Sequence, residues 1–205
     1  MSRPIIDGIL LAAGESRRMG FPKPLLKVGN ETFLERSLRG MLEVTRSVIV
    51  VTGAHRERVR AAVPSTPRVR VVHNAHFRRG QLSSLKCAIR ETALDADAAL
   101  VHLADYPLVE ASTFRALGDK FGSVGAQILI ARNAGRRGHP VLFARSVFAE
   151  LMAAPDDQGA RFVVNADPER VVYVDVDDPG VSLDLDTPED LRRAGISLPA
   201  GEEKG

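Results

Sequence analysis

The chain has 205 residues, of which 44% are hydrophobic and 26% are charged, and these proportions are typical of a globular protein with a sizeable core. Its 28 basic and 26 acidic side chains leave a formal net charge of only +2, with no long basic run, so small anions are expected as ligands rather than nucleic acids. The single cysteine, Cys87, excludes an intramolecular disulfide framework and an all-thiolate metal site.

No apolar run approaches the roughly 20 residues that cross a bilayer. The apolar stretch at 5–13 contains Asp7 and has no convincing cleavage site, which argues against a secretory signal. We therefore expect a cytoplasmic protein with no membrane partner.

Along the first half of the chain, short β-branched runs alternate with segments of helical period. This alternation is typical of a parallel sheet with crossover helices. The strand runs are continuously apolar, as in strands that are covered on both faces. The pattern predicts strands at 5–11, 47–52, 69–73 and 97–103 and helices near 32–42, 55–63 and 83–93.

The second half continues the α/β pattern with a helix near 112–121 and strands at 127–131 and 140–143. Two short helical pieces are expected within 145–167, followed by an edge strand at 170–176. The last helix is capped by Thr187, has Pro188 at its first position and carries acidic residues in its first turn. We expect one domain over residues 1–198 and a disordered tail at 199–205.

The segment 11–20, LAAGESRRMG, directly follows the first predicted strand, and Lys23 comes shortly after it. An α/β sheet places its anion sites at the carboxyl ends of its strands. Glycine lets backbone N–H groups approach phosphate oxygens, Arg offers a planar fork and Lys a mobile charge. No Gly-Lys-Ser/Thr or G-x-G-x-x-G spacing occurs. The residue types predict an anion grip, with a turn of solvated basic residues as the alternative.

Carboxylates follow two other predicted strands or extended segments. Asp105 ends a buried strand, and Asp184 and Asp186 lie just before the last helix. Because Mg²⁺ in proteins binds one or two carboxylates together with substrate phosphates, these acidic ends are candidates to share one metal ion. Capping of the helix that follows is an equal alternative for Asp105.

Two polar segments complete the candidate site. The segment 78–85, RRGQLSSL, opens a helix with donors suited to a base edge or a ribose, although Ser83 or Ser84 could equally cap the helix. The segment 136–140, RRGHP, places basic groups before a strand, which suits an anionic acceptor; a solvated turn is the alternative.

Taken together, these segments resemble the molybdenum cofactor nucleotidyltransferase family, and the cytidylyltransferase branch more than the guanylyltransferase branch. The resemblance runs from about residue 5 to residue 194. The matching segments are LAAGESRRMG at 11–20, Lys23, GQLSSL at 80–85, DYP at 105–107, GHPVLF at 138–143, DQGAR at 157–161 and DLDTPED at 184–190.

The resemblance implies a three-layer, Rossmann-like nucleotidyltransferase fold and Mg²⁺-dependent transfer of CMP from CTP to the terminal phosphate of a molybdopterin-type cofactor. It implies Arg18, Lys23 and Asp105 as catalytic residues and Asp105 with Asp186 or Asp184 as metal ligands. The acceptor, a phosphorylated pterin, is expected beside Arg137, His139 and Arg161. The expected nucleotide-binding residues are Leu11, Ala12, Ala13, Gly14, Ser16, Arg18, Lys23, Gly80, Ser83 and Ser84.

Base choice is expected to depend on Ala13, because members of the guanine type carry Gly at this position and a methyl group leaves less room for a purine. The sequence departs from the family at Ala104, where Gly is frequent, and at Tyr106, where Gln is common. The alternatives are a nucleotidyltransferase that uses GTP or another phosphorylated acceptor, or a non-catalytic cofactor carrier for a molybdenum hydroxylase.

Overall fold

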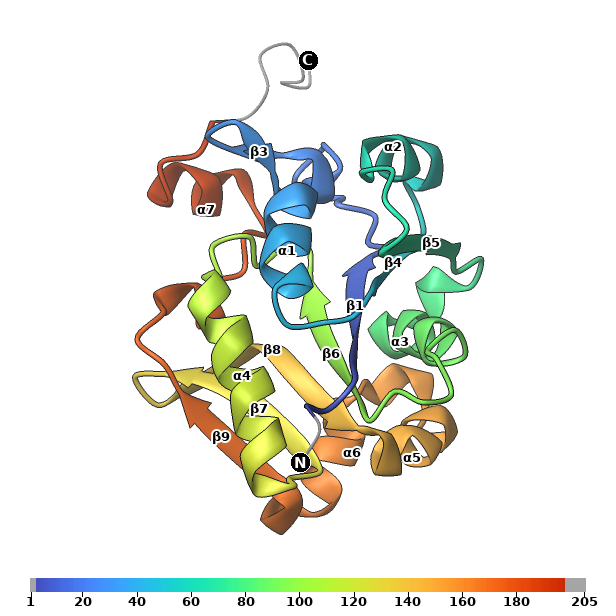
Figure 1. The fold of residues 1–205 in the computed structure, drawn as a ribbon. Helices are drawn as coiled ribbons and strands as arrows, with labels where there is room; N and C mark the ends of the chain where they lie inside the picture. Colours follow the sequence, from blue (N-terminus) through green and yellow to red (C-terminus); the bar gives the residue numbers. More distant parts are fainter. Residues whose placement is uncertain (1–2, 198–205) are drawn as a thin grey trace.

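A seven-stranded sheet forms the centre of the computed structural model, which describes residues 3–197 (Figure 1). Its strands are β1 (Ile6–Ala12), β4 (Val48–Thr52), β5 (Val69–His73), β6 (Ala98–Leu103), β7 (Ile128–Asn133), β8 (Arg136–Ala144) and β9 (Val171–Asp175). They lie in the order β5-β4-β1-β6-β8-β7-β9, and only β8 runs antiparallel to its neighbours. The expected α/β fold with a mostly parallel sheet is confirmed. The expected tail at 199–205 lies outside the described residues.

Helices cover both faces of the sheet and make a three-layer arrangement (Figure 1). One face packs against α1 (Phe33–Leu42), α2 (Arg56–Ala62) and α4 (Ala111–Val124). The other face packs against α3 (Gln81–Ile89), α5 (Phe148–Ala153) and α6 (Arg161–Ala166). No helix within residues 3–197 is long and apolar enough to span a bilayer.

The alternation of side chains along β1 explains the two layers, because successive residues of a strand point to opposite faces. Ile6 and Leu10 join the core under α1, α2 and α4, whereas Ile9 and Leu11 join the core under α3, α5 and α6. The whole strand is buried, which accounts for its largely apolar sequence.

The last helix and a small hairpin form a separate cap on the sheet. α7 (Pro188–Arg193) begins as predicted, with Thr187 and Asp190 forming a reciprocal capping box and Pro188 at the first position. Its residue Leu191 packs with Phe33 and Leu26 beside the strands β2 (Lys27–Val28) and β3 (Glu31–Thr32). This two-stranded hairpin was not predicted, because each strand has only two residues.

The basic segment at 136–140 was placed wrongly, since it lies inside β8 rather than before a strand. The turn lies at Ala134 and Gly135, which both have positive φ angles of 45° and 79°. A register shift between Ile130 and Arg132 then realigns β7 with β8. The hairpin therefore extends the strand predicted at 140–143 by four residues at its start, to Arg136.

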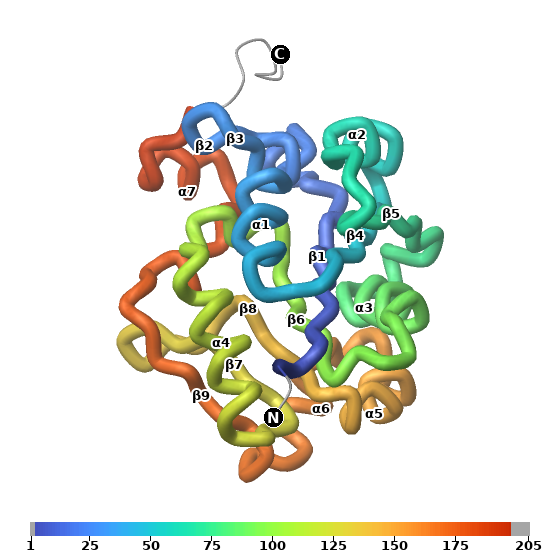
Figure 2. The backbone as a smooth tube through the Cα atoms, in the orientation of Figure 1, coloured from blue at the N-terminus to red at the C-terminus, as the bar shows by residue number. Residues whose placement is uncertain are grey.

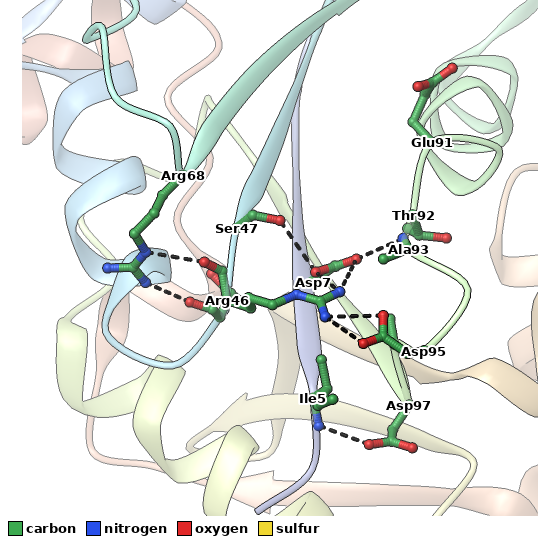
Figure 3. Close-up of polar contacts among 12 residues, drawn as sticks. Ile5, Asp7, Arg46, Ser47, Arg68, Glu91, Thr92, Ala93, Asp95 and Asp97 are labelled. Atoms are coloured by element: carbon green, nitrogen blue, oxygen red, sulfur yellow. Dashed lines mark hydrogen bonds and ion pairs between the residues drawn. The ribbon is translucent and has the colours of Figure 1, made fainter.

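Asp7 is a carboxylate in the otherwise apolar β1, and it is 1% exposed. It accepts hydrogen bonds from Arg46 Nη2 at 3.1 Å, Ser47 Oγ at 3.3 Å and the Ala93 backbone N–H at 3.0 Å (Figure 3). Arg46 also pairs with Asp95. These bonds join β1 to the segment before β4 and to the segment before β6, at the end of the sheet away from the carboxyl ends of the strands.

The carboxyl ends of β1, β4 and β6 meet at one edge of the sheet. Ala12 pairs with Thr52, and Leu11 pairs with Leu103. In Figure 2 this edge faces the top of the view, where the β2–β3 hairpin and α7 also lie. The predicted anion loop and the Asp105 segment are therefore neighbours in space.

Candidate functional site

A cavity of about 320 Å³ lies at this edge of the sheet, between the loop after β1 and the start of α3. Most of the expected nucleotide-binding residues line it: Leu11, Ala12, Ala13, Gly14, Ser16, Lys23, Gly80 and Ser84. Asp105 lines it as well. Arg18 and Ser83 do not line it. We call this space the first cavity.

The loop over the first cavity is shaped by local hydrogen bonds. Ser16 has a positive φ of 51°, and its carbonyl oxygen accepts from Met19 and Gly20 N–H at 3.0 Å each. Its hydroxyl oxygen accepts from the Lys23 backbone N–H at 3.0 Å. Ser16 therefore holds the loop closed and fixes the start of the Lys23 segment. A Cβ built at Gly14 meets no atom within 4 Å, so the backbone there borders open space.

Lys23 lies between two carboxylates from distant parts of the chain. Its Nζ donates to Asp105 Oδ2 at 2.6 Å and to Asp186 Oδ1 at 2.5 Å. Burial alone would lower the pKa of Lys23, but the charge of Asp105 and the hydrogen bonds to both carboxylates raise it above its ordinary value. Arg18, whose side chain is 72% exposed, pairs with the other oxygen of Asp186.

This carboxylate pair suits a hard divalent cation. Asp105 and Asp186 converge on one point, and a cationic group, the Lys23 ammonium, lies there. Within residues 3–197 no group of three or more His, Cys, Asp or Glu could hold a metal, so a metal here would take further ligands from substrate and water, as Mg²⁺ commonly does.

The segment that carries Asp184 and Asp186 is fastened to the Asp105 turn. The backbone N–H of the fully buried Leu185 donates to the carbonyl oxygen of Asp105 at 2.9 Å. Asp186 forms an ion pair with Lys23. Asp184 is exposed, and its charge helps to raise the pKa of Tyr106. Burial first, and then the charges of Asp184, Asp105 and Asp186, raise the pKa of Tyr106 to about 12.

A second cavity, of about 460 Å³, adjoins the first. The two share the lining residues Leu11, Gly80, Gln81 and Leu103. All three expected acceptor-binding residues line the second cavity: Arg137, His139 and Arg161. The rest of its wall is largely apolar and includes Leu85, Val101, Ile130, Val141, Phe143 and Val164. The cavity therefore combines a largely apolar wall with two guanidinium groups, and Asp156 and Asp157 line it as well.

His139 lies among aromatic rings rather than in water. Its ring is centred 5.0 Å from that of Tyr106 and 6.3 Å from that of His102. Burial lowers the pKa of His139 below its ordinary value, so the positive charge of the second cavity comes from Arg137 and Arg161. His102 is fully buried, and burial lowers its pKa to about 3. Its Nε2 donates to the carbonyl oxygen of Tyr106 at 3.2 Å, which steadies the turn after Asp105.

Several lining residues were not identified from the sequence. Phe77, Arg78 and Glu15 line the first cavity, and Glu15 accepts hydrogen bonds from Arg17 and Arg78 across its rim. Arg78 lies in a segment already singled out for its donors, so its position offered a signal. Phe77 offered none, because an isolated aromatic residue in a polar turn is more often packing than ligand contact.

Comparison with known proteins identifies the family. The model of the MobA-like NTP transferase domain matches residues 8–171. The molybdenum cofactor cytidylyltransferase of Escherichia coli (strain K12) is 27% identical over 186 residues, covering 91% of this chain and 93% of that protein. Nicotine blue oxidoreductase of Paenarthrobacter nicotinovorans is 30% identical over 198 residues, covering 93% of this chain and 96% of that protein.

A solved structure shares the fold over nearly the same length. The structure of Rv0371c from Mycobacterium tuberculosis H37Rv in complex with manganese superposes with a TM-score of 0.76 and 31% identity, covering 92% of this chain and 97% of that chain. The family match spans most of the sequence and includes the anion loop, the α3 segment and Asp105. This chain therefore belongs to the MobA-like NTP transferase family, the nucleotidyltransferases of the molybdenum cofactor.

Proposed function

We propose that this protein transfers CMP from CTP to the terminal phosphate of a molybdopterin-type cofactor and releases pyrophosphate. The observation that carries the proposal is the junction of the two cavities. A loop suited to phosphates and a carboxylate pair border the first cavity, and two guanidinium groups border the second. A nucleotide in one and a phosphorylated heterocycle in the other would meet near Leu11 and Gly80, which line both.

In the proposed reaction an oxygen of the acceptor phosphate attacks the α-phosphorus of CTP. A new P–O bond forms there, the bond to the β-phosphate oxygen breaks, and pyrophosphate leaves. Because the attacking oxygen is already anionic near neutral pH, no general base is needed. The protein contributes position and charge: Lys23 toward the α-phosphate, Arg18 toward the β- and γ-phosphates, and Arg137 with Arg161 toward the acceptor.

Asp105 and Asp186 are the residues that would hold Mg²⁺. The ion would supply positive charge that stabilises the triphosphate and its leaving group. The relative crystallised with manganese supports a divalent cation in this family. Asp184, which is exposed and does not reach the Lys23 pair, is the less suitable of the two C-terminal carboxylates.

The metal assignment predicts that Asp105→Asn lowers CMP transfer by about a hundredfold, the usual scale for loss of one charge-stabilising group. Pyrophosphate release would be measured with CTP, Mg²⁺ and purified molybdopterin. Asp119→Asn, at an exposed position on α4, is the matched control and should keep full turnover. Wild-type turnover in Asp105→Asn would contradict the assignment.

Ala13 supports the choice of CTP. It is 8% exposed and lines the first cavity. A Cβ built at Gly53 would lie 2.9 Å from the Ala13 methyl group and 2.8 Å from Phe77, so Ala13 and Phe77, which both line the cavity, pack tightly against Gly53. We expect the base to lie against this part of the cavity wall, so removing the methyl group would leave more room for a larger base.

Ala13→Gly is therefore expected to shift the ratio of kcat/KM values for GTP over CTP upward by about tenfold, since one methyl group in a binding pocket discriminates by about 1–3 kcal/mol. Steady-state kinetics with both nucleotides and the same acceptor measure this ratio. An unchanged ratio would show that base choice depends on other residues.

A second candidate function is reduction of an aromatic compound in the second cavity. The relative named nicotine blue oxidoreductase favours it, as does the apolar wall of that cavity. Consumption of NADH or NADPH with an aromatic acceptor, without pyrophosphate from any nucleotide, would support it. A pure carrier for a molybdenum hydroxylase would instead bind cofactor without Mg²⁺ and catalyse neither reaction.

A further inference from the structure

Asn74 lies in the turn after β5 and is 5% exposed. Its backbone N–H donates to Thr52 O at 2.9 Å. Its side-chain Oδ1 accepts from the backbone N–H of His76 at 2.9 Å. A backbone N–H can only donate, so this bond fixes which side of the Asn74 amide is oxygen. The NH₂ group must therefore point the other way.

On that other side lie the two serines of the α3 segment. Asn74 Nδ2 donates to Ser83 Oγ at 2.9 Å and to Ser84 Oγ at 3.0 Å. An NH₂ group carries two hydrogens and no lone pair to accept with, so both serine oxygens are acceptors toward Asn74. Each serine then has one hydroxyl hydrogen left to place.

The hydroxyl groups of Ser83 and Ser84 differ in their hydrogen-bond acceptors. Ser83 Oγ donates to the carbonyl oxygen of Gly80 at 2.8 Å, with that of His76 at 3.2 Å, so Ser83 serves the helix start. Ser84 Oγ has no hydrogen-bond acceptor among residues 3–197, although its side chain is almost fully buried. Of the two, Ser84 lines the first cavity and Ser83 does not.

We infer that Asn74 is a positioning residue that commits the Ser84 hydroxyl to donate into the first cavity, so that the bound nucleoside must present a hydrogen-bond acceptor there. A carbonyl oxygen or an unprotonated ring nitrogen of a base such as cytosine is such an acceptor, and so is a ribose oxygen. The inference rests on the proposed function, because it takes the first cavity as the nucleotide site. Beyond that function, the Ser84 hydroxyl is the donor in one hydrogen bond to the nucleoside, and the buried Asn74 sets this direction.

Asn74→Asp tests this direction with almost no change of shape. One carboxylate oxygen still accepts from His76, and the other faces the serines as an acceptor. Both hydroxyls then turn toward residue 74, so that Ser84 offers only lone pairs to the cavity. Affinity for Mg²⁺-CTP, measured by titration calorimetry, is expected to fall about tenfold, the scale of one such hydrogen bond with its partner left unpaired.

Inorganic tripolyphosphate separates this effect from general damage, because it has the phosphates but no nucleoside. Asn74→Asp should bind Mg²⁺-tripolyphosphate like the wild type. Equal losses for CTP and tripolyphosphate would overturn the inference, since they would indicate a disturbed phosphate loop or repulsion by the new charge.

Ser84→Ala should reproduce the loss for CTP, and Asn74→Asp should then add little in the Ser84→Ala background, because the two act through one hydroxyl. Ser83→Ala is the matched comparison: it should lower the Tm by a few degrees and reduce CTP affinity far less than Ser84→Ala. This serine pair keeps the test intact even if Asn74→Asp does not fold. Wild-type CTP affinity in Ser84→Ala would overturn the inference.

A nucleotide without the 2′-hydroxyl distinguishes the base from the ribose as the acceptor. If the Ser84→Ala loss persists with 2′-deoxy-CTP, the acceptor is on the base or elsewhere than the 2′-hydroxyl; if it disappears, the 2′-oxygen is the acceptor. Either result supports donation by Ser84. A wild-type protein that binds no nucleoside triphosphate would overturn the proposed function itself, and with it the inference.

Discussion

Lys23 is the residue in which the anion loop and the acidic pair come together. Its ammonium nitrogen lies 2.6 Å from Asp105 and 2.5 Å from Asp186. A divalent cation bound to these carboxylates must either displace the Lys23 ammonium group or bind next to its positive charge. Displaced toward a bound nucleotide, the same ammonium group would be available to the α-phosphate.

This competition predicts opposite effects of Lys23→Met on two measurements. Binding of Mn²⁺ without nucleotide should tighten by at least about tenfold, because a competing positive charge is removed from the carboxylates. CMP transfer should fall by about a hundredfold, because the charge next to the reacting phosphate is lost. Electron paramagnetic resonance of free Mn²⁺ reports the first effect and pyrophosphate release the second.

Arg17→Met is the matched control for this pair of measurements. Arg17 is 76% exposed and pairs with Glu15 rather than with Asp105 or Asp186. The substitution Arg17→Met removes the same charge from the same loop. It should change the affinity for Mn²⁺ by less than about twofold, as expected for an exposed ion pair. If Lys23→Met binds Mn²⁺ no more tightly than the wild type, Lys23 does not compete for the site.

At the residue scale, the sequence could predict the charged groups but not the buried ones that orient them. Lys23, Asp105 and Asp186 follow motif segments, and the parallel sheet brings their loops to one edge. Asn74 had no comparable signal, because its role depends on serines nine and ten residues away whose orientation only the folded chain fixes. Ser83 and Ser84 could not be distinguished from sequence for the same reason.

At the element scale, α3 connects the two cavities. Its Lys86 donates to Asp156 Oδ1 at 2.7 Å and to Ala154 O at 2.6 Å, and its side chain is only 13% exposed. A Cβ at Gly80, at the start of the same helix, would lie 3.0 Å from the carbonyl oxygen of Asp156. The segment that leads to Arg161 is therefore held against the helix whose start lines the first cavity.

Lys86→Met is expected to raise the KM for the acceptor by about tenfold while kcat and the KM for CTP change less than about twofold. The size follows from the loss of a charge-assisted hydrogen bond, taken at its lower range because Asp156 is partly exposed. Hydrogen exchange should quicken at residues 156–161. Equal increases in both KM values would show instead that α3 itself had been disturbed.

The elements themselves could mostly be predicted from periodicity. The regions predicted as strands and helices were found, with ends displaced by a few residues for most of them. The segment at 136–140 was the main error, because its basic groups were predicted to lie before the strand, with a solvated turn as the alternative. Its actual place in β8 depends on pairing with β7 across the turn at Ala134 and Gly135, which the local pattern did not indicate.

At the scale of the whole molecule, the order of the strands in the sheet brings the residues of the candidate site together. The four parallel strands β5, β4, β1 and β6 place their loops at one edge, and the antiparallel β8 next to β6 brings Arg137 and His139 beside that edge. Alternating strands and helices indicated the parallel part. The insertion of β8 between β6 and β7 could not be inferred in this way, because it depends on contacts between distant segments rather than on local period.

The stability of the whole molecule should depend on pH through His102. Its pKa is about 3 in the folded protein against 6.5 as the ordinary value, because burial disfavours the charged ring. Between these values the unfolded chain binds a proton that the folded chain refuses. The stabilisation is therefore complete above pH 6.5 and is lost as the pH falls, by about 1.4 kcal/mol per pH unit for one such group. The lowered pKa of His139 acts in the same direction.

His102→Gln should abolish the proton uptake of the unfolded chain at this position, because Gln does not titrate. The Gln side chain still offers a donor for the carbonyl oxygen of Tyr106. The free energy of unfolding in urea would be measured for wild type and variant from pH 7 to pH 4.5. Carboxyl groups with lowered pKa values, such as Glu15, contribute near the acid end of this range in both proteins, so their contribution cancels in the difference between the two curves. The variant should be less stable at pH 7, and its stability should fall less steeply with acid by close to one proton per molecule. Parallel curves would mean that His102 takes up its proton in the folded protein as readily as in the unfolded chain.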